Sequence, residues 1–192
     1  MEFFASRAAT WEDRFPDDGP AFAAAIAELA PAPGQTVLDA GAGTGRALPL
    51  LRQAVGGSGH VVAVDLTPEM LRVAAGKGRG EQAALLLADA LRLPLRAGCV
   101  DAILAAGLLS HLLDPAAVLA ELARVTRPGG RLAMFHPVGR AALAARRGHG
   151  LRADDIRAEP NLRPVLERTG WSLTGFDDGA GRYLALATRK NC

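Results

Sequence analysis

The chain has 192 residues, of which 49% are hydrophobic and 22% are charged, and its formal net charge is +2. This length fits one domain of ordinary size, and the composition is that of a folded globular chain rather than a disordered or fibrous one. The near-neutral charge gives no overall attraction to nucleic acid or to a membrane surface. We therefore expect a single domain over residues 1–192.

Membrane insertion, secretion and metal binding find no support in the sequence. The longest apolar stretch, residues 102–113, is shorter than the ~20 residues that a spanning helix needs and contains Ser110 and His111. The N-terminal segment carries acidic side chains and lacks the continuous apolar core of a signal peptide. Cys99 and Cys192 have neither disulfide nor metal-ligand spacing. We expect a cytoplasmic protein that binds no metal and no membrane.

From residue 20 onward, helical patterns alternate with short apolar runs. Helices are predicted over residues 21–30, 46–55, 69–75 and 116–125. Strands are predicted over residues 36–39, 61–65, 85–89, 100–106 and 131–136, the last after a turn at 128–130. The runs at 85–89 and 100–106 are continuous, which is typical of strands buried on both faces of a parallel sheet. This alternation predicts βαβ units.

The C-terminal part departs from this alternation. A helix is predicted over residues 164–170, and two strands, 171–176 and 183–188, are joined by a short loop. So short a connection makes a hairpin, and we expect the final strand to run antiparallel to the others. The predicted fold is α/β, a Rossmann-like doubly wound sheet of seven mostly parallel strands with an antiparallel C-terminal hairpin strand. Residues 138–161 show no clear pattern.

A glycine-rich turn follows the first predicted strand. Gly41, Gly43 and Gly45 stand at alternate positions, which lets the backbone turn sharply and approach a ligand, with the amides of the next helix facing it. Asp65 ends the second predicted strand about 20 residues later, where an acidic side chain can accept hydrogen bonds from both hydroxyls of a ribose. The order of these features predicts a site for a nucleoside-containing ligand.

The spacing of this turn disfavours two common ligand classes. In a dinucleotide-binding fingerprint the third small residue would fall on Arg46 or on Leu48, and neither is small. A phosphate-binding P-loop would need a lysine directly after the turn, and none is present. Ligands that carry a pyrophosphate are therefore not expected.

These residues resemble class I S-adenosylmethionine-dependent methyltransferases. The acid and the G-x-G-x-G turn of that family match Asp39, Gly41, Gly43 and Gly45. The segment Arg124–Leu132 is similar to the family's turn into its fifth strand, and the C-terminal hairpin is typical of its topology. The sequence LLSHLLD after the fourth predicted strand resembles the ubiquinone-biosynthesis-like branch. The resemblance covers residues 34–189.

The resemblance implies S-adenosylmethionine as cofactor and S-adenosylhomocysteine as product. The family holds the ribose at the position of Asp65 and reads the adenine amino group near Asp89 and Ala90. It further implies that residues 1–33 form a helical lid, with Trp11 and Arg14 as contacts, and that residues 138–161 are a variable segment on the substrate side. The full set of implied cofactor-binding residues is Trp11, Asp39, Gly41, Ala42, Gly43, Thr44, Gly45, Asp65, Leu66, Met70, Asp89, Ala90 and Ala106.

By this resemblance, the residues after the fourth predicted strand exclude several classes of methyl acceptor. They lack the motifs of methyltransferases acting on adenine or glutamine amino groups, and the paired glutamates of arginine methyltransferases are also missing. Cys99 precedes its strand, at the edge opposite the site, so it does not suit a nucleophilic mechanism. The Asp-Asn pair of metal-dependent catechol enzymes is replaced by His136 and Pro137. We therefore expect a small-molecule acceptor without a metal.

His111 is the candidate catalytic residue because it follows a strand at the ligand edge, where a histidine can accept a proton from the acceptor. Packing beneath the cofactor is the alternative role for His111. Two alternatives for the whole chain also stay open: a non-catalytic module that binds the cofactor, or a methyltransferase acting on nucleic acid through the basic residues Arg140, Arg146, Arg147 and Arg152. A monomer and a homodimer are both compatible with the sequence.

Overall fold

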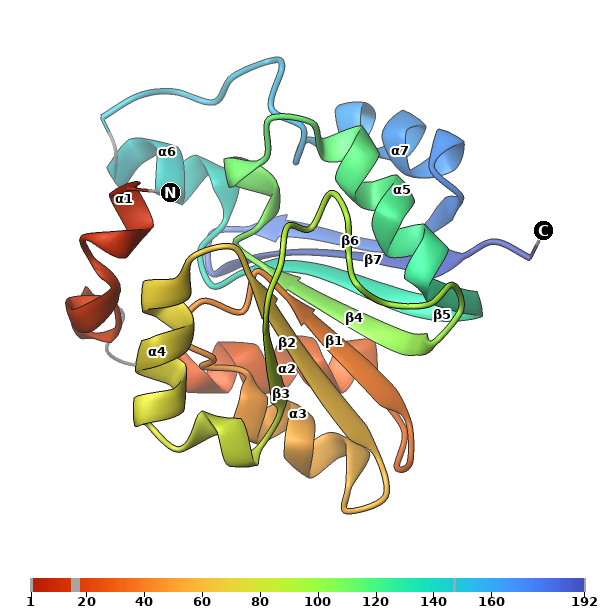
Figure 1. Ribbon diagram of the computed structural model, residues 1–192. Helices are drawn as coiled ribbons and strands as arrows, with labels where there is room; N and C mark the ends of the chain where they lie inside the picture. The colour runs from red at the N-terminus through yellow and green to blue at the C-terminus, as the bar shows by residue number, and fades with distance from the viewer. Residues whose placement is uncertain (1, 15–17, 147, 192) are drawn as a thin grey trace.

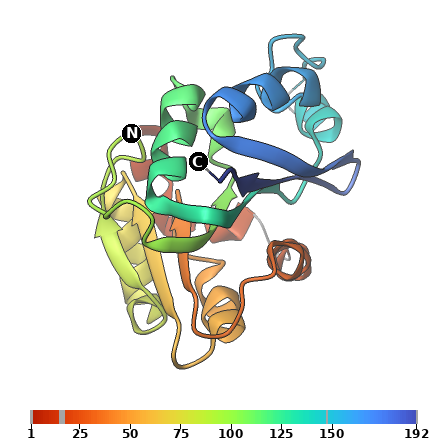
Figure 2. The same ribbon diagram turned by 90° about the vertical axis from the view of Figure 1, so that its right-hand side faces the viewer.

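The computed structural model describes residues 2–14, 18–146 and 148–191. Its centre is a seven-stranded sheet in the order β3-β2-β1-β4-β5-β7-β6 (Figures 1 and 2). The strands are β1 (Thr36–Ala40), β2 (His60–Asp65), β3 (Ala84–Leu87), β4 (Val100–Ala106), β5 (Thr126–His136), β6 (Trp171–Gly179) and β7 (Arg182–Arg189). All pairs among β1 to β5 are parallel, and β7 is antiparallel to both of its neighbours. The predicted fold, including the antiparallel hairpin strand, is confirmed.

Helices cover both faces of this sheet. The α-helices are α1 (Glu2–Ala5), α2 (Gly19–Leu29), α3 (Leu48–Val55), α4 (Pro68–Gly76), α5 (Pro115–Val125), α6 (Arg140–Arg146) and α7 (Glu159–Arg168). Short 3-10 turns are η1 (Ala8–Thr10), η2 (Glu12–Arg14), η3 (Arg79–Glu81) and η4 (Leu109–His111). Helices α2 and α3 pack on one face of the sheet and α5 and α7 on the other, which gives a three-layer molecule (Figure 2).

Helix α5 shows how the sequence builds one of these layers. The Asp114 side chain accepts a hydrogen bond of 2.9 Å from the backbone N–H of Ala117, and Pro115 occupies the first turn, where its missing N–H costs nothing. The apolar stripe of the helix is buried, and Trp171 of β6 donates its indole N–H to the carbonyl of Leu119 at 2.9 Å. The helix predicted over residues 116–125 is confirmed, and α5 is fixed against the C-terminal hairpin.

The helix after the glycine turn begins later than predicted, at Leu48 rather than Arg46. Residues 42–48 form hydrogen-bonded turns instead. The N–H of Gly45 donates to the carbonyl of Ala42 at 2.8 Å, and the N–H of Leu48 donates to the carbonyl of Gly45 at 3.1 Å. The apolar pattern marked the buried face of the helix correctly but could not show where the turn ends.

Strand β3 is shorter than predicted and is not buried on both faces. It ends at Leu87, which is 59% exposed, instead of reaching Asp89. The reason is its place at the edge of the sheet, where it pairs with β2 alone among the described strands. Its continuous apolar run therefore reflects composition rather than two-sided burial.

Two further boundaries differ from the prediction. The expected turn at 128–130 lies within β5, as a bulge between the pairs Val100 with Thr126 and Ala102 with Arg131. Helix α7 begins at Glu159 and contains Pro164 in its interior. The segment 138–161, which had no clear pattern, holds α6 and the start of α7. In the described part of the chain, no helix is both long and apolar enough to span a bilayer.

Candidate active site

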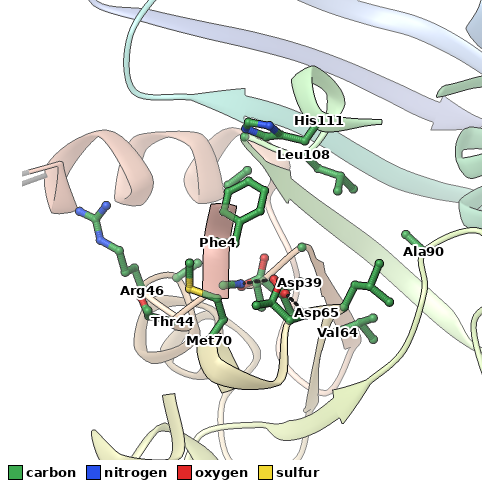
Figure 3. Close-up of a pocket in the computed structure, with 18 of the residues that line it drawn as sticks. Phe4, Asp39, Thr44, Arg46, Val64, Asp65, Met70, Ala90, Leu108 and His111 are labelled. Atoms are coloured by element: carbon green, nitrogen blue, oxygen red, sulfur yellow. Dashed lines mark hydrogen bonds between the residues drawn. The ribbon is translucent and has the colours of Figure 1, made fainter. Parts of the chain in front are cut away.

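A cavity of about 460 Å³ lies at the carboxyl edge of the parallel strands (Figure 3). Its walls come from the glycine turn after β1, the end of β2, the segment after β3 and the residues that follow β4 and β5. The N-terminal segment and α2 close the remaining side. Ligands of open α/β sheets bind at this edge, and the volume is in the range of small-molecule sites, roughly 300–1,000 Å³.

The glycine turn forms the floor of the cavity through left-handed backbone conformations. Gly41 has a φ of +74°, and a Cβ there would lie 3.0 Å from Leu108 Cδ1, so a side chain would collide with the opposite wall. Gly45 has a φ of +81°, and its Cβ would lie 2.7 Å from Leu48 Cδ1. Gly41 thus keeps the cavity open, whereas Gly45 permits close packing beneath the turn and does not line the cavity.

Asp65, the last residue of β2, is held rigidly beside this turn. One carboxylate oxygen accepts a hydrogen bond of 2.7 Å from the backbone N–H of Gly43 (Figure 3). The other accepts a hydrogen bond of 2.8 Å from the backbone N–H of Thr67. Each carboxylate oxygen has two acceptor positions, so each can take one more hydrogen bond. This arrangement fits the two adjacent hydroxyls of a ribose.

Asp39, at the end of β1, is 2% exposed and lines the same cavity. Burial, together with the neighbouring charge of Asp65, raises the pKa of Asp39 to about 7. A buried carboxyl of this kind is poised to ionise when a cation arrives.

Nearly all of the predicted cofactor residues come together around the cavity. Its lining includes Trp11, Asp39, Gly41, Ala42, Gly43, Thr44, Asp65, Leu66, Met70, Asp89, Ala90 and Ala106, and also His111. Gly45 is the exception, for the packing reason given above. The side chain of Asp89 is exposed and accepts the N–H of Leu91 at 2.9 Å, which shapes the loop after β3.

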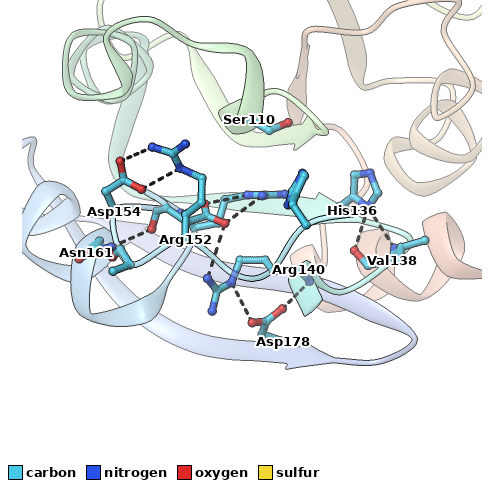
Figure 4. Close-up of polar contacts among 12 residues, drawn as sticks. Ser110, His136, Val138, Arg140, Arg152, Asp154, Asn161 and Asp178 are labelled. Atoms are coloured by element: carbon cyan, nitrogen blue, oxygen red, sulfur yellow. Dashed lines mark hydrogen bonds and ion pairs between the residues drawn. The ribbon is translucent and has the colours of Figure 1, made fainter. Parts of the chain in front are cut away.

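Two histidines stand at the opposite wall from the glycine turn. His111 lies on η4, and its ring meets Phe4 edge-on at 4.9 Å between centroids (Figure 3). His136 ends β5, and its Nδ1 is 2.8 Å from the carbonyl oxygen of Val138 and 3.1 Å from its backbone nitrogen (Figure 4). The ring centroids of Phe4 and Trp11 are 5.6 Å apart, so aromatic rings of the N-terminal segment reach the same wall.

An ion-pair cluster that sequence reasoning missed fastens the N-terminal segment to the glycine turn. Glu12 accepts a hydrogen bond of 2.6 Å from the Thr44 hydroxyl, pairs with Arg79, and lies 3.3 Å from the Lys77 ammonium. Burial raises the pKa of Glu12, but the hydrogen bonds from Arg79 and Thr44 outweigh it and hold the pKa at about 2. Arg79 also donates to the Thr44 carbonyl. No local pattern marks partners that are so distant in sequence.

Arg46 was also missed as a residue of the cavity wall. Its guanidinium pairs with Asp18, the residue that precedes α2, and lies 5.5 Å from the ring centroid of Phe22. Both Arg46 and Asp18 line the cavity. In the sequence, Arg46 only argued against a dinucleotide fingerprint.

Ion pairs within segment 138–161 and between it and β6 fix its described residues (Figure 4). Arg140 donates from its backbone and from Nε to the carboxylate of Asp178 on β6, at 2.9 and 2.8 Å, and Asp155 lies 3.6 Å from Arg140 and 2.9 Å from Arg157. None of its described residues lines the cavity. Arg152 pairs with Asp154. The basic residues considered for nucleic acid are thus partly neutralised. The Arg14 side chain, Arg147 and Cys192 lie outside the described part of the structure.

The described residues contain no cluster of three or more His, Cys, Asp or Glu side chains arranged to hold a metal ion. Cys99 is an exposed free thiol on the loop before β4, away from the cavity lining. The described cavity lining includes the backbone of the glycine turn, the carboxylates Asp39, Asp65 and Asp89, and the histidines His111 and His136.

Comparison with known proteins agrees with this geometry. A family model described as "Methyltransferase domain" matches residues 38–134. A ubiquinone/menaquinone biosynthesis C-methyltransferase of Acidiphilium cryptum is 42% identical, over 84% of this chain and 76% of the relative. An uncharacterized transposon protein of Streptomyces fradiae is 42% identical over 55% of this chain, which spans only 31% of that relative.

Solved structures give the same answer at the level of the fold. A SAM-dependent methyltransferase from Aquifex aeolicus superposes with a TM-score of 0.79 and 26% identity, covering 96% of this chain and 98% of that one. The family model spans the glycine turn, Asp65 and β4, which build a large part of the cavity. The chain belongs to the methyltransferase-domain family of S-adenosylmethionine-dependent enzymes.

Proposed function

We propose that this chain transfers the methyl group of S-adenosylmethionine to a small-molecule acceptor without the help of a metal ion. When bound, the cofactor supplies an activated methyl group. The observation that carries the proposal is Asp65, which the glycine turn fixes at the cavity with one acceptor position left on each carboxylate oxygen. This matches a ribose and requires no pyrophosphate site.

The other cavity residues divide the binding of the cofactor among them. Leu66 and Ala90 supply apolar walls for the adenine, and Asp89 accepts from its amino group. The backbone of Gly41, Ala42, Gly43 and Thr44 lies under the amino-acid end, and Asp39 takes its ammonium. Met70, Ala106 and Trp11 complete the lining. Roles of this kind align the reacting groups, which is the main contribution an enzyme makes to a displacement reaction.

The N-terminal segment acts as a lid in this proposal. The described residues of segment 1–33 form one domain with the sheet, and the lid residues Phe4 and Trp11 exclude water from the cavity. The contact of Glu12 with Thr44 fixes the lid to the turn that binds the cofactor.

The acceptor is a small molecule with an apolar, flat ring. Phe3, Phe4, Phe22, His111 and His136 bring aromatic rings to the cavity lining, and such walls suit a planar acceptor. The Acidiphilium relative is named for ubiquinone and menaquinone biosynthesis, which supports a quinone-type ring. The proposed transfer needs no metal ion. Methyl transfer measured with and without EDTA checks that point.

His111 accepts the proton that the acceptor loses. Its place on the cavity wall supports this role, and so does its position after the carboxyl end of β4. His111→Asn should lower kcat about 10²- to 10⁴-fold while S-adenosylhomocysteine affinity stays within about threefold. His60→Asn, at the opposite edge of the sheet, serves as the matched control and should leave kcat unchanged. An unaltered kcat in the His111 variant would assign that histidine to packing against Phe4.

Calorimetric titration with S-adenosylmethionine, S-adenosylhomocysteine and NAD tests the cofactor assignment. The wild-type protein should bind the first two and not NAD. Asp65→Ala should weaken both by about tenfold or more, because two charge-assisted hydrogen bonds to the ribose are lost. Glu167→Ala, on α7 and outside the cavity lining, controls for loss of an acidic residue. Equal affinity in wild type and Asp65→Ala would refute the proposal. Binding without turnover of any acceptor would instead indicate a non-catalytic module.

A further inference from the structure

A second and much smaller cavity lies beside the one proposed to hold the cofactor and the acceptor. Its volume of about 10 Å³ is close to what one water molecule or one ligand oxygen needs. The two cavities share four lining residues: Gly107, Leu108, Ser110 and His136. A Cβ on Gly107 would have no neighbouring atom within 4 Å, so the space around this residue is open. The small cavity therefore adjoins the large one at the wall that carries the histidines.

The hydroxyl of Tyr183 on β7 is buried at this small cavity and has no hydrogen-bond partner in the described part of the chain. The residue as a whole is 2% exposed. Its ring has a structural role, since it packs edge-on against Phe176 with 5.8 Å between the ring centroids. The hydroxyl adds nothing to that packing, and an unpaired hydroxyl in the interior costs free energy. A phenylalanine would fill the same place without this cost, so the hydroxyl points to a ligand.

Arg157, from the segment before α7, brings a second donor group to the small cavity. The carboxylate of Asp155 accepts hydrogen bonds from its Nε at 3.0 Å and from its Nη2 at 2.9 Å. The two N–H groups of Nη1 take no part in this pairing and can donate to a ligand.

The charges around Tyr183 favour an oxygen that carries negative charge. Burial raises the pKa of Tyr183, so its hydroxyl keeps its proton at neutral pH and can donate a hydrogen bond. The positive charges of Arg157 and Arg140 oppose this rise in pKa, and they outweigh the two aspartates, Asp155 and Asp178, that add to it. A bound anion at the hydroxyl would therefore meet a net attraction.

We propose that Tyr183 and Arg157 bind the phenolate oxygen of a ring-shaped methyl acceptor. A guanidinium has no acceptor position and a tyrosine hydroxyl can donate, so this pair favours an oxygen over an amino group. A phenolate carries its oxygen at the edge of a flat ring. The ring can lie between the aromatic side chains of the large cavity while the oxygen enters the small one. This inference rests on the proposed function, because it takes the acceptor to be a flat ring in the large cavity.

Binding of 4-nitrophenol and 4-nitroanisole tests this site. At pH 8 the first is mainly a phenolate, and the second is its neutral methyl ether. Both are titrated calorimetrically into protein saturated with S-adenosylhomocysteine. Wild type should prefer 4-nitrophenol by about a hundredfold, because the ether offers no charge to the two donors. The control Arg168→Met, exposed on α7 and outside both cavity linings, should show the same preference.

In Tyr183→Phe and in Arg157→Met that preference should fall about tenfold, while 4-nitroanisole binds within about twofold of wild type. Tyr183→Phe should also be no less stable to denaturant than wild type, because it loses only an unpaired hydroxyl. This variant decides the proposal even if Arg157→Met fails to fold.

An unchanged preference in Tyr183→Phe would overturn the role of the small cavity. The same conclusion follows if wild type binds S-adenosylhomocysteine but holds both probes equally or holds neither. If wild type does not bind S-adenosylhomocysteine, the proposed function itself fails, and this inference fails with it.

Discussion

The Asp39 carboxylate has opposite effects on stability and on the proposed cofactor binding: its charge lowers the stability of the ligand-free fold but attracts an ammonium. It is buried on the cavity floor near the charge of Asp65, and its pKa is raised from 3.8 to about 7. Below pH 3.8 the carboxyl is protonated in both the folded and unfolded chain. Between pH 4 and 7 the folded chain holds a proton that the unfolded chain has lost, so the free energy of unfolding falls as pH rises. Above pH 7 the full cost of burying the charge remains.

Asp39→Asn should therefore stabilise the ligand-free protein at pH 8 by about 2–4 kcal/mol, and the gain should vanish as pH falls to 4. The same variant should bind S-adenosylhomocysteine about tenfold more weakly, because it offers no charge to the ammonium. Denaturant unfolding of both proteins at pH 4, 6 and 8 checks the first part, and calorimetry checks the second. A gain in stability that is equal at every pH would contradict the role given to the charge.

Most of the predicted cofactor residues line the cavity, and they could be predicted because their signals are local. Gly41 and Gly43 follow a strand directly, and Asp65 ends the next strand, so topology alone brings them to one edge. Arg46 and Glu12 were missed because their importance depends on partners, Asp18 and Arg79, that only the folded chain brings near. Their residue types fit an ordinary solvated surface equally well.

At the scale of elements, the N-terminal segment depends on a few polar contacts. Its helix α1 and turns η1 and η2 contribute mostly exposed or half-buried residues, and Ala8 is buried among them. Glu12 joins this segment to Thr44 in the glycine turn and to Arg79 in η3. A segment with little buried apolar area and an ionic anchor is expected to open before the rest of the fold.

Glu12→Gln should loosen the N-terminal segment without unfolding the sheet. Because the pKa of Glu12 is lowered from 4.5 to about 2, its contribution is fully present above pH 4.5 and is lost as pH falls through about 2. At pH 7 the variant should be cleaved about fivefold faster by a protease within residues 2–14 and should release S-adenosylhomocysteine faster by a similar factor. The exposed Glu2→Gln is the control. Identical cleavage in the two variants would count against the anchor.

Element types were predictable from the chain, whereas their exact ends and exposure were not. The alternation of apolar runs and helical stripes gave the strands and major helices, because periodicity reports the buried face. The exposure of Leu87 follows from β3 lying at the edge, a property of strand order rather than of the run itself. The bulge around residues 127–130 follows from the register with β4, which no single segment contains.

At the scale of the whole molecule, the cavity joins parts of the chain that are distant in sequence. Four parts of the chain meet there: the N-terminal segment, the glycine turn, the end of β2 and η4. Helices α5 and α7 pack on the face of the sheet opposite to α2 and α3. The ring of Phe4 in the N-terminal segment contacts the ring of His111 on η4. A ligand in the cavity would add contacts between these parts and bind only the folded state.

Binding of S-adenosylhomocysteine should therefore raise the free energy of unfolding of the entire fold. At a concentration one hundred times Kd, S-adenosylhomocysteine should contribute about 2.7 kcal/mol, which corresponds to a rise in Tm of about 5–10 °C for a chain of this length. Thermal unfolding followed by circular dichroism measures the shift, and NAD at the same concentration should cause none. In Asp65→Ala the shift should shrink at equal ligand concentration because Kd has risen. A rise in Tm that is the same in wild type and in Asp65→Ala would place the ligand elsewhere than this cavity, since mass action ties stabilisation to affinity at the site that is occupied.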